Sequence, residues 1–149
     1  MALGYTTYKT PNAIYTIHND LSGCEGFGVK LYAQGEVEIA DSSGDVPYAI
    51  VTVGGPSEDG VTYPGLIGGS SVEFVDMLGC TVQVTVSSAT AIIAGQFLQI
   101  DDGDADGTFT PAAPTAAGQW IWGLALTNSG AGEQCLMRFQ PQYVWYVAP

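Results

Sequence analysis

The sharpest chemical motif in the sequence is a run of alternate aspartates, Asp102, Asp104 and Asp106, followed by Gly107. Oxygen ligands at alternate positions before a glycine resemble the first half of a calcium-binding loop. Counting from Asp102, the twelfth position is Ala113, where an EF-hand requires a bidentate glutamate. The flanking residues are typical of strands and of Pro/Ala-rich links, not of helices. We therefore expect a solvated hairpin turn here, with a structural calcium site as the alternative, and we assign no metal or cofactor.

The single histidine, His18, would have to serve as the base of any Ser-His-Asp or Cys-His catalytic set. It lies in a polar N-terminal segment, where a preorganised active site is not expected. Paired carboxylates could hydrolyse glycosides if they met in space, but most acidic residues stand beside Gly or Ser in turns. The glycines form neither a dinucleotide-binding motif nor a P-loop. The sequence therefore predicts that the protein is not an enzyme.

Basic side chains are scarce in this chain. Its net charge is −12, and Lys9, Lys30 and Arg138 are its only strongly basic residues. A protein that binds nucleic acid needs Lys and Arg to neutralise phosphates, and anionic membrane surfaces attract the same residues. We therefore expect neither nucleic-acid nor membrane partners. There is also no apolar run of transmembrane length and no apolar segment typical of a signal peptide.

Three widely spaced cysteines, Cys24, Cys80 and Cys135, form no CxxC pair. An odd number of distant cysteines argues against a zinc site, a redox motif or a disulfide framework. We interpret them as small buried hydrophobic residues of a protein made in a reducing cytoplasm.

The composition favours an all-β domain. Twenty glycines and eight prolines supply many turns, and Val, Ile, Thr and Tyr are plentiful. We expect a small β-sandwich or β-barrel of short strands, with little helix and with long Gly/Pro loops such as residues 54–70. The expected strands cover residues 28–33, 35–40, 47–53, 71–76, 80–86, 95–100, 108–110, 119–126 and 134–139.

Two segments share one form. Residues 35–44 and 95–104 each begin with Gly, continue as an alternating strand and end in an acidic turn. The spacing is too long for a solenoid repeat, and the form occurs only twice. It favours two similar sheets in a sandwich or small barrel.

Two tryptophans, Trp120 and Trp122, are two residues apart on one expected strand and so share a face. That face is either part of the core or an exposed aromatic surface that binds sugars or another subunit.

Both ends of the chain are rich in tyrosine or other aromatic residues. We interpret residues 1–23 as an extended arm carrying Tyr5, Tyr8 and Tyr15, with an ordinary edge strand plus a frayed terminus as the alternative. Residues 141–149 form an aromatic tail that either closes the core or contacts a partner. The candidate interface residues are Tyr5, Tyr8, Tyr15, Tyr143, Trp145 and Tyr146.

Several short segments follow one another in an order that is more specific than any one of them. They are Gly35-x-Val37-x-Ile39-Ala-Asp, Pro47-Tyr-Ala-Ile-Val51, the Val-rich strand 80–86, Ala94-Gly95-Gln-Phe-Leu-Gln-Ile-Asp with an Asp-Gly turn, Thr108-Phe-Thr-Pro-Ala112, Gly123-Leu-Ala-Leu126 and Ala131-Gly132-Glu133. In this order they resemble the capsid decoration (cement) proteins of tailed bacteriophages over roughly residues 25–140. The 54–70 loop and the tail 143–149 depart from the family pattern.

The resemblance implies a compact β domain, residues 24–140, that forms a homotrimer on the outer surface of a virion. In that family the domain clamps adjacent major capsid proteins against the pressure of packaged DNA, without enzyme activity or cofactor. The protein would be made in the host cytoplasm. The alternative is a virion- or cell-surface β module that binds carbohydrate through exposed tryptophans.

Overall fold

A computed structural model describes residues 14–18, 20–33, 36–53, 62–64, 73–103 and 106–145. Within these residues the chain forms strands and turns and no helix. One sheet contains β1 (Ile14–Ile17), β2 (Gly28–Ala33), β3 (Glu36–Ile39), β4 (Ala49–Val53), β5 (Thr62–Pro64) and β6 (Glu73–Val75). The other contains β7 (Thr81–Thr85), β8 (Phe97–Ile100), β9 (Phe109–Pro111), β10 (Trp120–Ala125) and β11 (Gln134–Tyr143).

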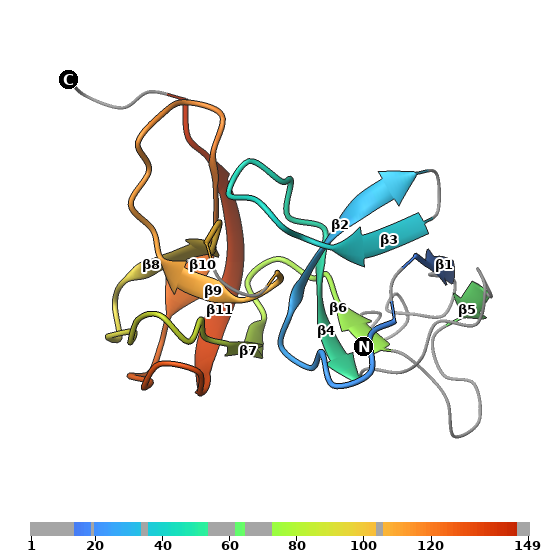
Figure 1. Ribbon diagram of the computed structural model, residues 1–149, viewed down its shortest axis with the longest axis horizontal. Coiled ribbons are helices and arrows are strands. Elements are labelled where there is room, and N and C mark those ends of the chain that lie inside the picture. Colours follow the sequence, from blue (N-terminus) through green and yellow to red (C-terminus); the bar gives the residue numbers. More distant parts are fainter. Residues whose placement is uncertain are drawn as a thin grey trace, which may run out of the picture.

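The first sheet has the strand order β5-β1-β3-β2-β4-β6, and the second has the order β7-β11-β10-β8-β9 (Figure 1). Strands β1 and β3 are parallel, and the other pairs are antiparallel. The two sheets pack together as a small β-sandwich, so the expectation of an all-β domain is confirmed. No helix in the described residues is long and apolar enough to cross a membrane.

Strand β4 explains how the two sheets share a core. Ala49, Ile50 and Val51 are all fully buried, although neighbouring side chains on a strand point to opposite faces. Ile50 belongs to a cluster with the second sheet, whereas Ala49 and Val51 pack with Leu21 on the other face. The continuous apolar run of this strand is therefore required, because both of its faces are covered.

The larger cluster contains Trp122, the largest of the fully buried side chains in the described residues. Its ring meets Phe109 edge-to-face at a centroid distance of 5.5 Å and lies 6.4 Å from the ring of Phe139. The indole Nε1 has no hydrogen-bond partner among the described residues, so packing alone holds this side chain. The core interpretation of the Trp120/Trp122 face is thus confirmed for Trp122.

The structure also differs from the expected elements at three places. Strand β5 lies inside segment 54–70, which the sequence indicated as loop. Strand β1 and the buried Leu21 belong to the folded domain, although both lie within residues 1–23. Strand β11 continues through Pro141 to Tyr143, beyond the expected boundary at residue 140.

Pro141 is tolerated in β11 for a local reason. Strand β7 pairs with β11 only as far as Arg138, and the β10–β11 register shifts between Phe139 and Gln142. The proline therefore stands where its missing N–H removes no regular ladder hydrogen bond.

Candidate functional site

Three aromatic rings, Trp120, Tyr143 and Trp145, lie in a row at one end of the five-stranded sheet; we call this row the aromatic ladder. The Trp120 and Tyr143 ring centroids are 5.1 Å apart with planes at 69°, and those of Tyr143 and Trp145 are 4.9 Å apart at 78°. Both pairs have the edge-to-face geometry that aromatic rings prefer. Trp120 packs against the core, whereas Tyr143 is 39% exposed and Trp145 is 81% exposed. The ladder thus runs from the core to solvent.

Backbone pairing holds the ladder in place. Trp120 and Tyr143 are register partners on β10 and β11, which brings their side chains next to each other. Beyond the strand, the N–H of Val144 donates to the Gln119 carbonyl at 2.9 Å, and the N–H of Gly118 donates to the Val144 carbonyl at 3.0 Å. Trp145 therefore follows directly on a hydrogen-bonded pair of strands.

An exposed tryptophan in an ordered position is the kind of residue that anchors protein interfaces, where Trp and Tyr are enriched. It could also stack on a sugar ring. Because neighbouring rings of the ladder are nearly perpendicular, they do not form one flat platform. The geometry favours an anchor that enters a partner's pocket.

The six residues expected at the interface are found in different places. Tyr143 and Trp145 are adjacent in the ladder, whereas Tyr15 lies in β1 of the other sheet, in backbone register with Tyr63 of β5. Tyr5, Tyr8 and Tyr146 lie outside the described residues. Trp120, which sequence reasoning linked to Trp122, belongs with the ladder through its contact with Tyr143.

Asp102, the first residue of the aspartate run, has a structural role. The two carboxylate oxygens of Asp102 accept hydrogen bonds from the N–H of Ser43 at 2.6 Å and from its Oγ at 2.9 Å. Asp106 is exposed, and Asp104 lies outside the described residues. In the part of the chain that the structure describes, no group of three or more His, Cys, Asp and Glu side chains is arranged so that it could hold a metal ion.

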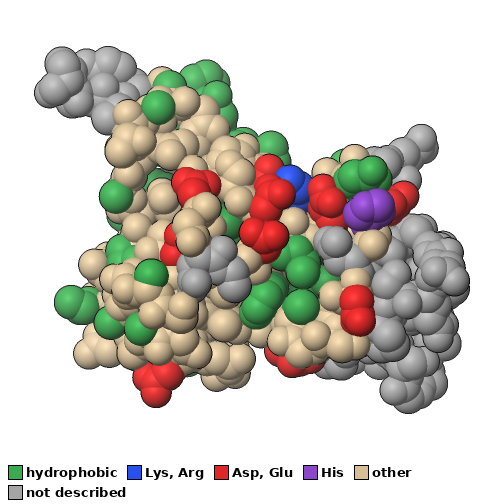
Figure 2. Space-filling view, viewed as in Figure 1, with side chains coloured by type: hydrophobic (Ala, Val, Ile, Leu, Met, Phe, Trp, Pro, Cys, Tyr) green, Lys and Arg blue, Asp and Glu red, His purple; other side chains and the backbone are tan. Residues whose placement is uncertain are grey.

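Lys30 is surrounded by carboxylates from β3 and from the turn that follows it. Its Nζ donates to Asp41 at 2.9 Å and to Asp45 at 3.2 Å, and it lies 3.7 Å from Glu38. Burial alone would lower the pKa of Lys30, but the hydrogen bonds and charges of Asp41 and Asp45 outweigh burial and raise it. Figure 2 shows acidic side chains gathered on this face with a basic side chain among them. Lys30 neutralises part of this cluster and so stabilises the turn.

No protein-family model matches the chain, and a search of curated proteins found no significant match. Function is therefore inferred from the residues themselves.

His18 and two of the cysteines are the residues whose surroundings bear on a base or a nucleophile. His18 lies at the surface, hydrogen-bonds Glu36 at 2.8 Å and stacks on Tyr32 with a centroid distance of 3.9 Å. Burial, followed by the charge of Glu25, raises the pKa of the Cys24 thiol, and burial likewise raises that of Cys80. Raised pKa values keep thiols protonated and poorly nucleophilic.

The exposed Tyr32, against which His18 packs, was not singled out from the sequence. A regular alternation would not leave both Leu31 and Tyr32 exposed, as they are here at 49% and 51%. The register between β2 and β3 shifts between Leu31 and Ala33, and this irregularity interrupts the alternation. No sequence signal marks that bulge.

Proposed function

We propose that this protein is a structural component of a bacteriophage virion that binds the outer capsid surface and clamps adjacent major capsid proteins. It carries out no catalysis and needs no cofactor in this role. The order of short segments across residues 25–140, which resembles capsid decoration proteins, supports the proposal. The all-β sandwich is the kind of fold that the resemblance implies.

The observation that carries the proposal is the exposure of Trp145 at 81% beside Tyr143. Tryptophan and tyrosine are enriched at protein interfaces, and these two neighbouring exposed rings offer a partner an apolar surface to cover. Tryptophan anchors at protein interfaces typically contribute about 2 kcal/mol or more each. Three copies in a trimer bind the shell together, and this multivalency strengthens binding well beyond one contact.

The charge of the chain agrees with an outer-surface position. A net charge of −12 keeps many copies soluble at high local concentration. Three free thiols suit synthesis in the reducing cytoplasm of a host cell.

Binding to capsid shells tests the proposal. Shells are assembled from the major capsid protein encoded nearest to this gene, and cosedimentation is measured with the wild type, with Trp145→Ala and with Leu78→Ala. Leu78 is a matched control because it is also a large exposed apolar side chain, at 72%. We expect Trp145→Ala to weaken binding at least about tenfold and Leu78→Ala less than about twofold.

Three results would count against parts of the proposal. If the wild type neither binds these shells nor raises the temperature at which they rupture, the decoration role is wrong. If Trp145→Ala binds as well as the wild type does, the ladder is not the contact. Light scattering at micromolar concentration tests the trimer, because the mass of one subunit would exclude a preformed oligomer.

The second candidate function is carbohydrate binding, which the exposed Trp145 also favours. In that case a sugar stacks on the free face of this ring, and glycans quench tryptophan fluorescence in the wild type but not in Trp145→Ala. A glycan array without hits, together with tryptophan fluorescence that glycans do not quench, would exclude carbohydrate binding.

A further inference from the structure

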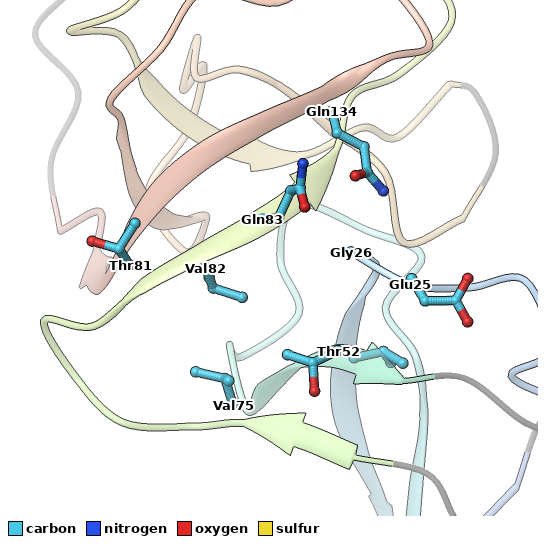
Figure 3. A pocket seen from close by; sticks show the side chains of 9 residues that line it. Glu25, Gly26, Thr52, Val75, Thr81, Val82, Gln83 and Gln134 are labelled. Atoms are coloured by element: carbon cyan, nitrogen blue, oxygen red, sulfur yellow. The ribbon is translucent and has the colours of Figure 1, made fainter. Parts of the chain in front are cut away.

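A groove of about 440 Å³ lies between the two sheets. Figure 3 shows β7 on one side of it, β4 and β6 on the other, and Glu25 with Gly26 at one end. Strands β6 and β7 are the outermost strands of their sheets. Its lining includes Glu25, Gly26, Val75, Thr81, Val82 and Gln83. It therefore runs between two sheet edges.

Backbone hydrogen bonds show which edge of β7 faces this groove. The N–H of Val86 donates to the Glu133 carbonyl at 2.8 Å, and the carbonyl of Cys80 accepts from Phe139 at 2.9 Å, so the even-numbered residues face β11. Backbone direction alternates along a strand, so Thr81, Gln83 and Thr85 point the other way. The N–H of Thr85 indeed donates to the Gly26 carbonyl, at 3.0 Å.

In the described residues, this backbone pairing between β7 and Gly26 involves Thr85 and does not extend to Gln83 or Thr81. No described strand pairs with the edge formed by Thr81 and Gln83, because β7 ends the strand order of its sheet. An edge with outward N–H and C=O groups is a template for another extended segment. Here Gly26 already makes the first contact, and the groove continues from it.

We propose that this groove binds an extended peptide segment of a partner protein, which adds to the edge of β7 as a further strand. The segment exchanges backbone hydrogen bonds with Gln83 and Thr81. Val75 and Val82 contact its inward side chains, which are small or β-branched. Added strands take affinity from the main chain and specificity from alternate side chains. The groove volume lies within the range of roughly 300–1,000 Å³ that is usual for ligand sites.

Charge indicates the chemistry of the segment. Glu25 is the charged side chain among the lining residues, and the whole chain carries a net charge of −12. A second copy at this edge would carry the same net charge of −12, which opposes pairing here, so a homotrimer is expected to form through another surface. A Lys or Arg beside Glu25 is complementary. The occupant is therefore a neutral to basic segment of another protein and not a second copy.

Proline at position 83 tests the site with little effect on the rest of the sheet. In Gln83→Pro the N–H that points into the groove is lost and the ring blocks the edge, whereas the pairing with β11 does not use that N–H. Gln83→Ala is the matched control because it removes the same side chain and keeps the N–H. The probes are peptides selected from a random library on the full-length chain.

We expect the selected peptides to carry alternating Val, Ile or Thr and one basic residue. Their affinity for Gln83→Ala should stay within about twofold of that for the wild type, and Gln83→Pro should bind at least about tenfold more weakly. Glu25→Gln should weaken binding several-fold at low salt and less at high salt. Binding should also slow hydrogen exchange at the amides of Thr81 and Gln83.

Three results would overturn the proposal: a library without binders, full binding by a folded Gln83→Pro, or a change in oligomeric mass caused by Gln83→Pro. The last would show that the edge pairs copies of this chain. If Gln83→Pro does not fold, hydrogen exchange on the wild type decides, because peptides that leave the amides of Thr81 and Gln83 unprotected bind elsewhere. The aromatic ladder does not line this groove, so capsid binding through Trp145 and peptide binding at β7 can succeed or fail independently.

Discussion

The carboxylate of Asp102 accepts two hydrogen bonds from Ser43, a residue 59 positions earlier in the chain. Ser43 is almost fully buried, and its Oγ also accepts a hydrogen bond from the side-chain amide of Gln119 at 3.0 Å. Its carbonyl accepts from the N–H of Trp120 at 2.8 Å. Hydrogen bonds thus connect the turn after β3 with the turn after β8 and with the start of β10, where Trp120 of the aromatic ladder lies.

Asp102→Ala should destabilise the fold, because it leaves the buried N–H and hydroxyl of Ser43 without their acceptor. Hydrogen bonds to a charged group contribute about 1.5–3 kcal/mol, and the exposure of Asp102 places the expected loss near the lower end, at about 1.5 kcal/mol. Urea unfolding of Asp102→Ala, Ser43→Ala and the double variant measures the coupling. Strict additivity would show that the Ser43 hydroxyl and Asp102 do not interact in solution, whereas the bond from the Ser43 N–H remains in Ser43→Ala and is not measured by this cycle.

Calcium should leave the melting temperature unchanged, because Asp102 is already engaged by Ser43. Anything that binds only the native state raises the melting temperature. Scans in millimolar calcium and in chelator measure this. A higher melting temperature with calcium, lost in Asp102→Ala, would favour the calcium site over the solvated turn.

Acid should weaken the turn around Lys30. The hydrogen bond from Lys30, followed by that with Asp45, lowers the pKa of Asp41. A carboxyl with a lowered folded pKa stabilises the fold above its ordinary pKa of about 4, and this stability is lost as the pH falls through the folded value. The pKa of Lys30 is raised, so its contribution is present below about pH 10 and is lost as the pH rises through the folded value.

Lys30→Met should therefore lower the free energy of unfolding by about 1 kcal/mol at neutral pH, and by less near pH 3. Urea unfolding across this range measures the difference. Glu38→Gln is the control because Glu38 lies farther from Lys30, at 3.7 Å, and should change stability little. A pH profile of Lys30→Met parallel to that of the wild type would contradict the assignment.

Gly123→Ala should be strongly destabilising. A Cβ at this position would meet the carbonyl oxygen of Arg138 and would lie 2.7 Å from the Met137 side chain. Overpacking of this kind typically costs about 1–3 kcal/mol. Gly44→Ala is the matched control, because its nearest atom would be 3.6 Å away and little change is expected. Thermal melting of the two variants compares them, and equal melting temperatures would refute the close contact.

Two tryptophans should behave in opposite ways when truncated. Trp122→Ala removes a fully buried ring and should cost about 3–5 kcal/mol, whereas Trp145→Ala should change stability by less than about 0.5 kcal/mol. Urea unfolding followed by circular dichroism measures both. A large loss of unfolding free energy in Trp145→Ala would show that this ring packs onto the core and is not available to bind a partner.

Removal of residues 1–13 should leave a folded domain that no longer decorates capsids. The deletion stops before Ile14 because β1 pairs with β3 and β5 and so belongs to the sheet. Circular dichroism reports folding, and cosedimentation with shells reports decoration. Full capsid binding by the truncated chain would refute the role of the arm.

The alternation of apolar and polar residues in the sequence made most strands predictable. In β7, Val82 and Val84 are buried while Thr81 and Gln83 are exposed, as a period of two requires. The apolar run of β4 likewise predicted burial on both faces. The short β5 escaped prediction because Thr62–Pro64 shows no alternation of its own and is a strand through its pairing with β1.

The shared form of segments 35–44 and 95–104 predicted two similar sheets, and the structure shows two sheets of different construction. Strand β2 lies between β3 and β4, whereas β8 pairs directly with β9. The local pattern of a strand and an acidic turn does not specify which strand pairs next, because pairing depends on contacts distant in the sequence.

By itself the sequence determined the fold class, the position of most strands and the scarcity of positive charge, because each follows from local composition and periodicity. Only the tertiary structure decided what the acidic turns and the tryptophans do. Asp102 meets Ser43, Trp122 is buried, and Trp145 is exposed beside Tyr143. These roles depend on which strands lie opposite one another, and residues far apart in the chain set that arrangement together.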